Sequence, residues 1–125
     1  MNPILLAMAA FEIKHFVCDF ALQNSWMIGK KGRYFHPGGL IHAGLHILGS
    51  LPALLLLTRA PKLIAMILAA EFIVHYHADF FKAKLDGHLQ LRSDTNAYWI
   101  VFGLDQLIHQ MTYITMIYAA TTLAI

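Results

Sequence analysis

The stretch Glu71-Phe-Ile-Val-His75-Tyr-His77-Ala-Asp79-Phe-Phe-Lys82 places acids and imidazoles inside a segment that is otherwise apolar enough to cross a membrane. Steps of three and four residues nearly complete a turn of an α-helix. Four ionisable side chains of this stretch therefore share one helix face: Glu71, His75, Asp79 and Lys82. Burying such a face in lipid is costly, and a bound metal ion would offset the cost. The stretch therefore predicts a metal site inside a membrane protein.

The composition points to a membrane protein with one domain. Hydrophobic residues make up 58% of the 125 residues and charged residues only 13%, whereas about a quarter of the residues in a soluble domain are charged. The net charge of +2 is too small to favour nucleic acid as a partner. We therefore expect residues 1–125 to form a single integral membrane domain.

Two further features limit the chemistry. Cys18 is the only cysteine, which excludes an intrachain disulfide and a zinc site built from cysteines. The first basic residue, Lys14, follows the apolar run 3–11, whereas a cleavable signal peptide begins with a basic region. The N-terminus is therefore interpreted as mature, and any metal ligands must be histidines and carboxylates.

The hydropathy pattern predicts an all-α fold with four transmembrane helices. Their expected bounds are about 3–23, 40–58, 63–81 and 97–124. The first helix is the most polar of the four, whereas the segments 24–39 and 82–96 are polar loops. Pro61 ends the short link between the middle two helices, because proline cannot continue a helix. Short links join antiparallel neighbours, so the prediction is an up-down-up-down bundle.

The basic residues predict the orientation of this bundle. The loops 24–39 and 82–96 lie on the same side of the membrane, and most of the cations flank or occupy them: Lys30, Lys31, Arg33, Lys82, Lys84 and Arg92. The opposite side carries only Arg59 and Lys62. Cytoplasmic loops are enriched in Lys and Arg, so both loops are expected in the cytoplasm and both termini outside.

Each predicted helix carries one pair of metal-ligating residue types at a spacing of four. The pairs are His15 and Asp19, His42 and His46, His75 and Asp79, and Asp105 and His109. Because successive helices run in opposite directions, the connectivity brings all four pairs to one layer, ~10 Å below the cytoplasmic ends at 1.5 Å per residue. A single such pair is more often structural, but four converging pairs favour a metal site.

These eight residues predict a divalent metal site with two ions. Imidazole and carboxylate suit zinc, manganese and iron, of which zinc is the leading expectation. Eight candidate ligands are more than one tetrahedral ion needs, and two ions about 3.5–4 Å apart, bridged by a carboxylate, would use them.

Other polar residues have less determined roles. Glu71 lies deeper than the eight candidates and is expected to be a general base, a partner of an imidazole or a ligand. Lys82 is expected to face the site as a cation or to anchor the helix at the interface, and Lys14 to snorkel or to pair with an acid on a neighbouring helix. The remaining histidines are expected to be solvated or to pack without a ligand role: His36, His77 and His88.

The segment His15-Phe-Val-Cys-Asp19-Phe-Ala-Leu22-Gln23 has the pattern HFxxDFxLQ, and HxxxH, HxxxDxxK and DQxxH blocks follow it. The chain thereby resembles a domain-of-unknown-function family of small multi-pass membrane proteins from phages and bacteria. The resemblance implies a location in the bacterial inner membrane and carries no activity. The HxxxD pairs of the chain are also similar to those of all-α zinc phospholipases and nucleases. This similarity is an analogy between sites and not a family relationship.

The leading interpretation is a membrane-embedded metal-dependent hydrolase. Its site near the cytoplasmic face would act on a phospholipid or lipid-linked phosphoester, with membrane lipid as partner. One alternative is a non-haem di-iron oxidase or desaturase, which metal identity would distinguish. Another is a structural or phage-exclusion protein in which metal staples the helices. A transporter would require a homo-oligomer, and bis-histidine haem would leave the carboxylates without a role.

Overall fold

The computed structural model describes residues 2–123, and within that range the chain forms helices and connections but no strands. The elements in chain order are α1 (Pro3–Phe16), the π-helical turn η1 (Val17–Leu22), α2 (Ser25–Ile28), α3 (Pro37–Leu55), α4 (Pro61–Leu89) and α5 (Asn96–Thr122). The predicted all-α class is confirmed for these residues.

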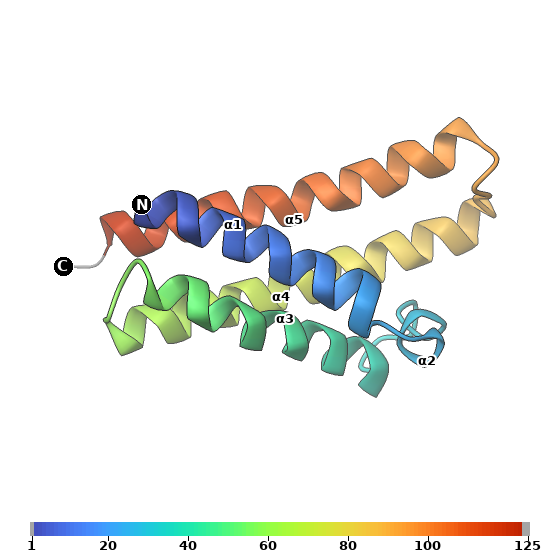
Figure 1. The fold of residues 1–125 in the computed structure, drawn as a ribbon. Coiled ribbons are helices and arrows are strands. Elements are labelled where there is room, and N and C mark those ends of the chain that lie inside the picture. Colours follow the sequence, from blue (N-terminus) through green and yellow to red (C-terminus); the bar gives the residue numbers. More distant parts are fainter. Residues whose placement is uncertain (1, 124–125) are drawn as a thin grey trace.

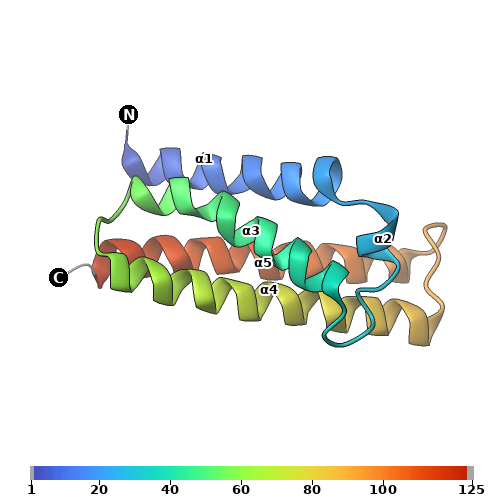
Figure 2. The same ribbon diagram turned by 90° about the horizontal axis from the view of Figure 1, so that it is seen from below.

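The four long helices run alternately in opposite directions (Figure 1). Helix α1 packs against α3 and α5, and α4 packs against the same two helices from the other side. Both ends of the chain lie at the same end of the molecule as the α3–α4 link, and α2 and the α4–α5 link lie at the opposite end (Figures 1 and 2). We call this second end the open end.

The interior divides into an apolar half and a polar half. The half near the chain termini is a continuous hydrophobic core: Ala7, Phe11, Ala53, Leu54, Leu63, Ile64, Ile67, Tyr113, Met116, Ile117 and Ala120. Nearer the open end, the buried side chains are mostly charged or polar. The molecule therefore concentrates its buried polar groups in one half of the bundle, and these groups form the candidate site.

Local sequence signals set where the helices begin. A proline occupies the first position of α1, α3 and α4, where its fixed φ suits the helix and its missing N–H is not needed. The side chain of Asn2 accepts a hydrogen bond from the backbone N–H of Ile4, and Thr95 caps α5 in the same way. Such caps satisfy backbone donors that have no partner inside the helix.

The third helix is longer than predicted. We expected it to end at about residue 81, but α4 continues to Leu89, so the predicted loop 82–96 is wrong over its first half. Its charged residues are good helix formers, and Lys82 and Asp86 form an ion pair one turn apart at 3.1 Å. The charged residues therefore do not mark the end of this helix.

The other predicted bounds also move. Helix α3 covers 37–55 in place of 40–58, and the segment predicted as 3–23 changes at Val17 from an α-helix to the π-helical turn η1. The predicted loop 24–39 contains the short helix α2.

The α2–α3 connection is fastened to α4. The backbone N–H of Phe35 donates to the hydroxyl of Tyr76 at 2.7 Å, and the hydroxyl of Tyr34 lies 2.8 Å from Nε2 of His77. This places the basic residues of the connection beside the open end of the bundle.

Within the described residues, α3 and α4 are long and apolar enough to cross a membrane. These two helices suggest association with a membrane. Helix α1 does not meet the same test because it has only 14 residues. Helix α5 has 27 residues, but no stretch of 18 of them is apolar enough.

Candidate metal centre

Six of the eight predicted ligand residues form two groups of potential ligand atoms. One group contains Asp19, His42, His46 and His75, and the other contains His75, Asp79 and His109. Within each group the candidate ligand atoms all lie within 4.8 Å of one another. Because His75 belongs to both groups, they form one continuous cluster that could hold a metal ion.

The two other predicted ligands lie at the edge of this cluster. Nε2 of His15 is 3.1 Å from Oδ2 of Asp19, and Oδ1 of Asp105 is 3.5 Å from Nε2 of His109. All four long segments therefore contribute to the cluster, as the connectivity predicted.

The element that carries Asp19 is unusual. Asp19 lies in η1, where the helix widens to a π-helical turn directly after His15. Single π turns within α-helices often occur at functional sites. Here the turn presents Asp19 to imidazoles of α3, because Oδ1 of Asp19 lies 3.1 Å from Nε2 of His42 and 3.0 Å from Nε2 of His46.

The cluster is closed to solvent from the sides. His42 and His46 are fully buried, and His75 and His109 are 2% and 1% exposed. The ring centroid of His75 lies 3.8 Å from that of His46 and 4.3 Å from that of His109. Imidazoles this close would repel one another if all were protonated, so the packing favours mostly neutral rings or rings bound to a cation.

The tautomer of His46 follows from its neighbour Lys14. The ammonium group of Lys14 lies 3.2 Å from Nδ1 of His46 and can only donate hydrogen bonds. Nδ1 of His46 must therefore accept, and in the neutral ring Nε2 then carries the hydrogen, which points to Asp19 at 3.0 Å. His46 consequently holds one oxygen of Asp19 in place.

His15 lies beside the other oxygen of Asp19. Nε2 of His15 lies 2.9 Å from the amide oxygen of Gln106, to which it donates a hydrogen bond, and 3.1 Å from Oδ2 of Asp19. The hydroxyl of Tyr113 can then donate to Nδ1 at 2.8 Å. Asp19 therefore accepts a hydrogen bond from His46 on one oxygen and has the imidazole of His15 close to the other.

The other three imidazoles of the cluster lack such partners. Neither ring nitrogen of His42 or His75 has a hydrogen-bond partner, nor does Nε2 of His109. Oδ1 of Asp105 also lacks one. The Nε2 atoms of these three imidazoles lie 3.1–3.6 Å from carboxylate oxygens without hydrogen-bond geometry.

Buried polar atoms without partners are costly. Three unpartnered imidazoles that converge on carboxylates are the donor set that zinc, manganese or iron accepts. The residues present therefore fit a divalent cation.

Glu71 lies one helical turn deeper than His75 and is 1% exposed. Its Oε1 accepts hydrogen bonds from Lys14 at 2.6 Å and from Ser50 at 2.7 Å, while Oε2 has no partner. The prediction that Lys14 pairs with an acid on a neighbouring helix is confirmed. Glu71 is absent from both groups of potential ligand atoms.

A polar cavity of about 290 Å³ leads from the cluster to the open end. Its lining includes Asp19, Asp79 and Asp105 from the cluster. Two lysines also line it: Lys31 forms an ion pair with Asp79 at 2.6 Å, and Lys82 pairs with Asp86 at 3.1 Å. Lys82 therefore faces the cavity. The sequence analysis did not identify Lys31 as a residue of the cavity. In a loop, unlike a helix, the spacing of residues does not show which side chains share a face, so nothing distinguished Lys31 from the neighbouring Lys30.

The remaining histidines lie outside the cluster. His77 contacts Tyr34 and the carbonyl of Ile73, and His88 is exposed on α4. His36 is half-buried, and its Nδ1 accepts from the backbone N–H of Gly38. The expectation that His36 is merely solvated is therefore wrong, since it caps α3.

Comparison with known proteins gives one match. The profile of a family described as "Protein of unknown function (DUF3307)" matches residues 7–125. No curated protein and no solved structure matches the chain. The description of the matching family states no activity.

Proposed function

The chain belongs to the DUF3307 family, and we propose that it is a membrane-embedded, metal-dependent hydrolase of a phospholipid or lipid-linked phosphoester. The observation that carries this proposal is the convergence of buried, unpartnered imidazole nitrogens on carboxylates, beside a polar cavity with two lysines. A fully enclosed cluster would be a structural metal site that only links the helices. This cluster borders a cavity that can admit a substrate.

The hydrogen bonds divide the eight predicted residues into two sets. We propose that His42, His75 and His109 bind one or two divalent cations together with the three aspartates of the cluster: Asp19, Asp79 and Asp105. We propose that His46 acts on the cation through Asp19, to which it donates a hydrogen bond, and that His15, which lies 3.1 Å from the other oxygen of Asp19, supports the same carboxylate. Such supporting contacts fix the geometry of metal ligands and strengthen binding.

A bound divalent cation would polarise the ester and lower the pKa of a water molecule at the site. The residues of the chain then have separate tasks. Lys31 and Lys82, which line the cavity, would bind the oxygens of an anionic phosphoester. Glu71 would hold Lys14 against His46, which makes it a positioning residue in place of the general base first expected.

The outer surface supports insertion of all four long helices. Large apolar side chains are exposed on α1 and α5 as well as on α3 and α4, among them Leu5, Ile13, Phe16, Leu48, Met66, Ile73, Ile100, Leu107, Met111 and Tyr118. Soluble monomers rarely expose contiguous apolar surface on this scale. Polar groups inside and apolar groups outside suit a bundle whose solvent is lipid.

The length of α4 supports the same arrangement. Its 29 residues span ~43 Å at 1.5 Å per residue, whereas the hydrocarbon core of a bilayer is about 30 Å thick. The charged segment from Lys82 to Leu89 would then project beyond the lipid at the open end. This explains why the helix continues through residues that resemble a loop in sequence.

Charge at the two ends predicts the orientation. The open end carries Lys30, Lys31, Arg33, Lys84 and Arg92, and the other end carries Arg59 and Lys62. In a Cys18→Ser background, Arg59→Cys is expected to react with a membrane-impermeant thiol reagent on intact bacterial cells, and Ser93→Cys is expected to react only after permeabilisation. The reverse labelling would place the site on the outer face.

The lysines of the cavity provide a test of substrate binding. Lys31→Met and Lys82→Met are each expected to lower kcat/KM for an anionic lipid ester by about 10–100-fold, because a hydrogen bond to a charged group contributes about 1.5–3 kcal/mol. Metal content should stay unchanged. Lys84→Met is the matched control, since Lys84 is exposed on the same helix and does not line the cavity. Equal activity in all three variants would contradict the assigned roles.

The metal itself separates hydrolysis from oxidation. Elemental analysis of the purified protein, with a screen of phospholipids and lipid-linked phosphates for release of a hydrolysis product, is the decisive experiment. Zinc or manganese with hydrolysis would support the proposal. Iron with oxygen-dependent turnover would replace it with an oxidase, and a metal-free, inactive protein would contradict both.

A further inference from the structure

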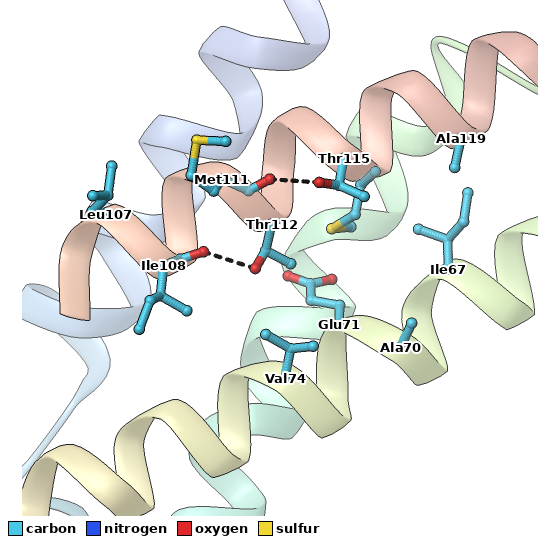
Figure 3. A pocket seen from close by; sticks show the side chains of 11 residues that line it. Ile67, Ala70, Glu71, Val74, Leu107, Ile108, Met111, Thr112, Thr115 and Ala119 are labelled. Atoms are coloured by element: carbon cyan, nitrogen blue, oxygen red, sulfur yellow. Dashed lines mark hydrogen bonds between the residues drawn. The ribbon is translucent and has the colours of Figure 1, made fainter. Parts of the chain in front are cut away.

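A seam between α4 and α5 contains two apolar cavities. The smaller, of about 270 Å³, is lined by the middle of α4 and the first half of α5: Ala78, Phe81, Lys82, Leu85, Val101, Leu104, Asp105 and Ile108. The larger, of about 510 Å³, lies deeper, between the segments 67–74 and 107–119. Figure 3 shows Glu71 and Val74 of α4 facing Ile108 and Thr112 of α5.

The cavities are neighbours along the seam because they share lining residues. The smaller apolar cavity shares Lys82 and Asp105 with the polar cavity, and it shares Ile108 with the deeper one. A ligand could therefore place a charged group among the lysines and cluster carboxylates while its apolar part follows the seam. This combination of one polar end and one long apolar end is that of a lipid.

The charges of the polar cavity select the head group. Four carboxylates and two ammonium groups line it, which gives a net charge of −2. One divalent cation would neutralise this charge, and two would change it to +2. Without metal the cavity repels an anionic head group, one cation removes the repulsion, and two attract the head group. Metal binding is thus expected to control which lipid occupies the seam.

One carboxylate borders the apolar seam. Glu71 lines the deeper cavity, and its Oε2 has no hydrogen-bond partner. Figure 3 shows the carboxylate directed from α4 towards α5. The nearby hydroxyls of Thr112 and Thr115 donate to carbonyls of their own helix. A hydroxyl group on the bound chain, or a water molecule that enters with it, would supply the donor that Glu71 lacks. The other oxygen of Glu71 is held by Lys14, so the charge of the carboxylate is compensated on the side away from the lipid.

We propose that the α4–α5 seam binds one acyl chain of an anionic membrane lipid whose head group occupies the polar cavity, so that the substrate enters sideways from the bilayer. This inference rests on the proposed function for the identity of the lipid as substrate. The binding itself can be measured without turnover.

The experiment uses the metal-loaded full chain in nanodiscs of zwitterionic lipid that contain a trace of phosphatidic acid with a photoreactive group in the middle of one acyl chain. Cross-links are expected mainly in peptides of the two cavities, and several-fold fewer on the outward face of α1, which carries Ile13 and Phe16. Excess unlabelled phosphatidic acid should displace the probe, and excess zwitterionic lipid should not. Chelation of the metal should lower cross-linking several-fold.

Matched substitutions on α4 make the test specific. Ala78→Phe fills the smaller cavity and is expected to lower cross-linking in the seam several-fold without loss of metal. Ala69 is exposed nine residues earlier, about two and a half turns away and thus on the opposite side of the helix, so Ala69→Phe should leave cross-linking unchanged.

Cross-links spread evenly around the bundle, or unaffected by Ala78→Phe in a protein that retains its metal and folds, would overturn the seam proposal. If Ala78→Phe fails to fold, the even or uneven distribution of cross-links in the unmodified protein decides alone. Cross-links concentrated in the seam without any hydrolysis would support lipid binding in the seam and count against the proposed hydrolase activity. Hydrolysis with evenly spread cross-links would support the hydrolase activity and count against lipid binding in the seam.

Discussion

His75→Ala is expected to remove most of the bound metal and to lower Tm in detergent more than loss of any other imidazole. His75 is the one residue that belongs to both groups of potential ligand atoms, and neither of its ring nitrogens has a hydrogen-bond partner. A cation present at a hundred times its Kd stabilises a protein by about 2.7 kcal/mol, which corresponds to about 10 °C for a chain of this size.

The measurement is elemental analysis together with thermal unfolding, with and without chelator. Chelation should lower the Tm of the unaltered protein towards that of His75→Ala and change the variant little. His77→Ala is the matched control, because His77 is two residues away and contacts Tyr34 in place of the cluster. A His75→Ala protein with its full metal content would remove the central claim about the site.

Lys14→Met is expected to destabilise the protein by about 3–5 kcal/mol, because removal of one partner leaves the other charge buried and unpaired. Lys14 is 7% exposed and Glu71 1%, and the pair is joined at 2.6 Å. Glu71→Met alone should have an effect of similar size. The double variant should be more stable than the sum of the two losses predicts, since no unpaired charge remains.

Unfolding by denaturant in mild detergent measures these differences as a double-mutant cycle. Recovery should be partial, because Ser50 and Nδ1 of His46 also lose partners in the double variant. Lys62→Met, at an exposed position in the first turn of α4, should change stability little. Strictly additive losses would mean that Lys14 and Glu71 are stabilised independently of each other.

The sequence was sufficient to predict the helices and the convergence of the site. Spacings of four residues place two side chains on one helix face, and alternating helix directions bring His15, His46, His75 and His109 to a common depth. Both arguments depend only on the rise and period of a helix. For Lys14 the sequence left two roles open, snorkelling or pairing with an acid on a neighbouring helix, and the structure shows the pair with Glu71.

The sequence was not sufficient to distinguish the candidate metal ligands from the residues that hydrogen-bond to those ligands. His42 and His46 share one spacing and one face, yet Lys14 directs the hydrogen of His46 towards Asp19 while His42 has no partner. This difference depends on the direction in which each hydrogen-bond donor points. The spacing of residues along the sequence gives no information about that direction. The end of α4 was mispredicted for another reason, because charged residues occur both in loops and on exposed helices, and α4 continues through them to Leu89.

The pairing of Lys14 with Glu71 also bears on how the chain enters a membrane. A Lys or Asp at the centre of a helix raises the free energy of translocon-mediated insertion by about 2.5–3.5 kcal/mol, and the first segment contains both Lys14 and Asp19. The hairpin of α3 and α4 contains the two helices of residues 2–123 that are long and apolar enough to cross a membrane, and it supplies Glu71. The first segment is therefore expected to remain at the translocon until this hairpin has been synthesised. The α3–α4 hairpin would then insert first, and the N-terminal helix would insert after it.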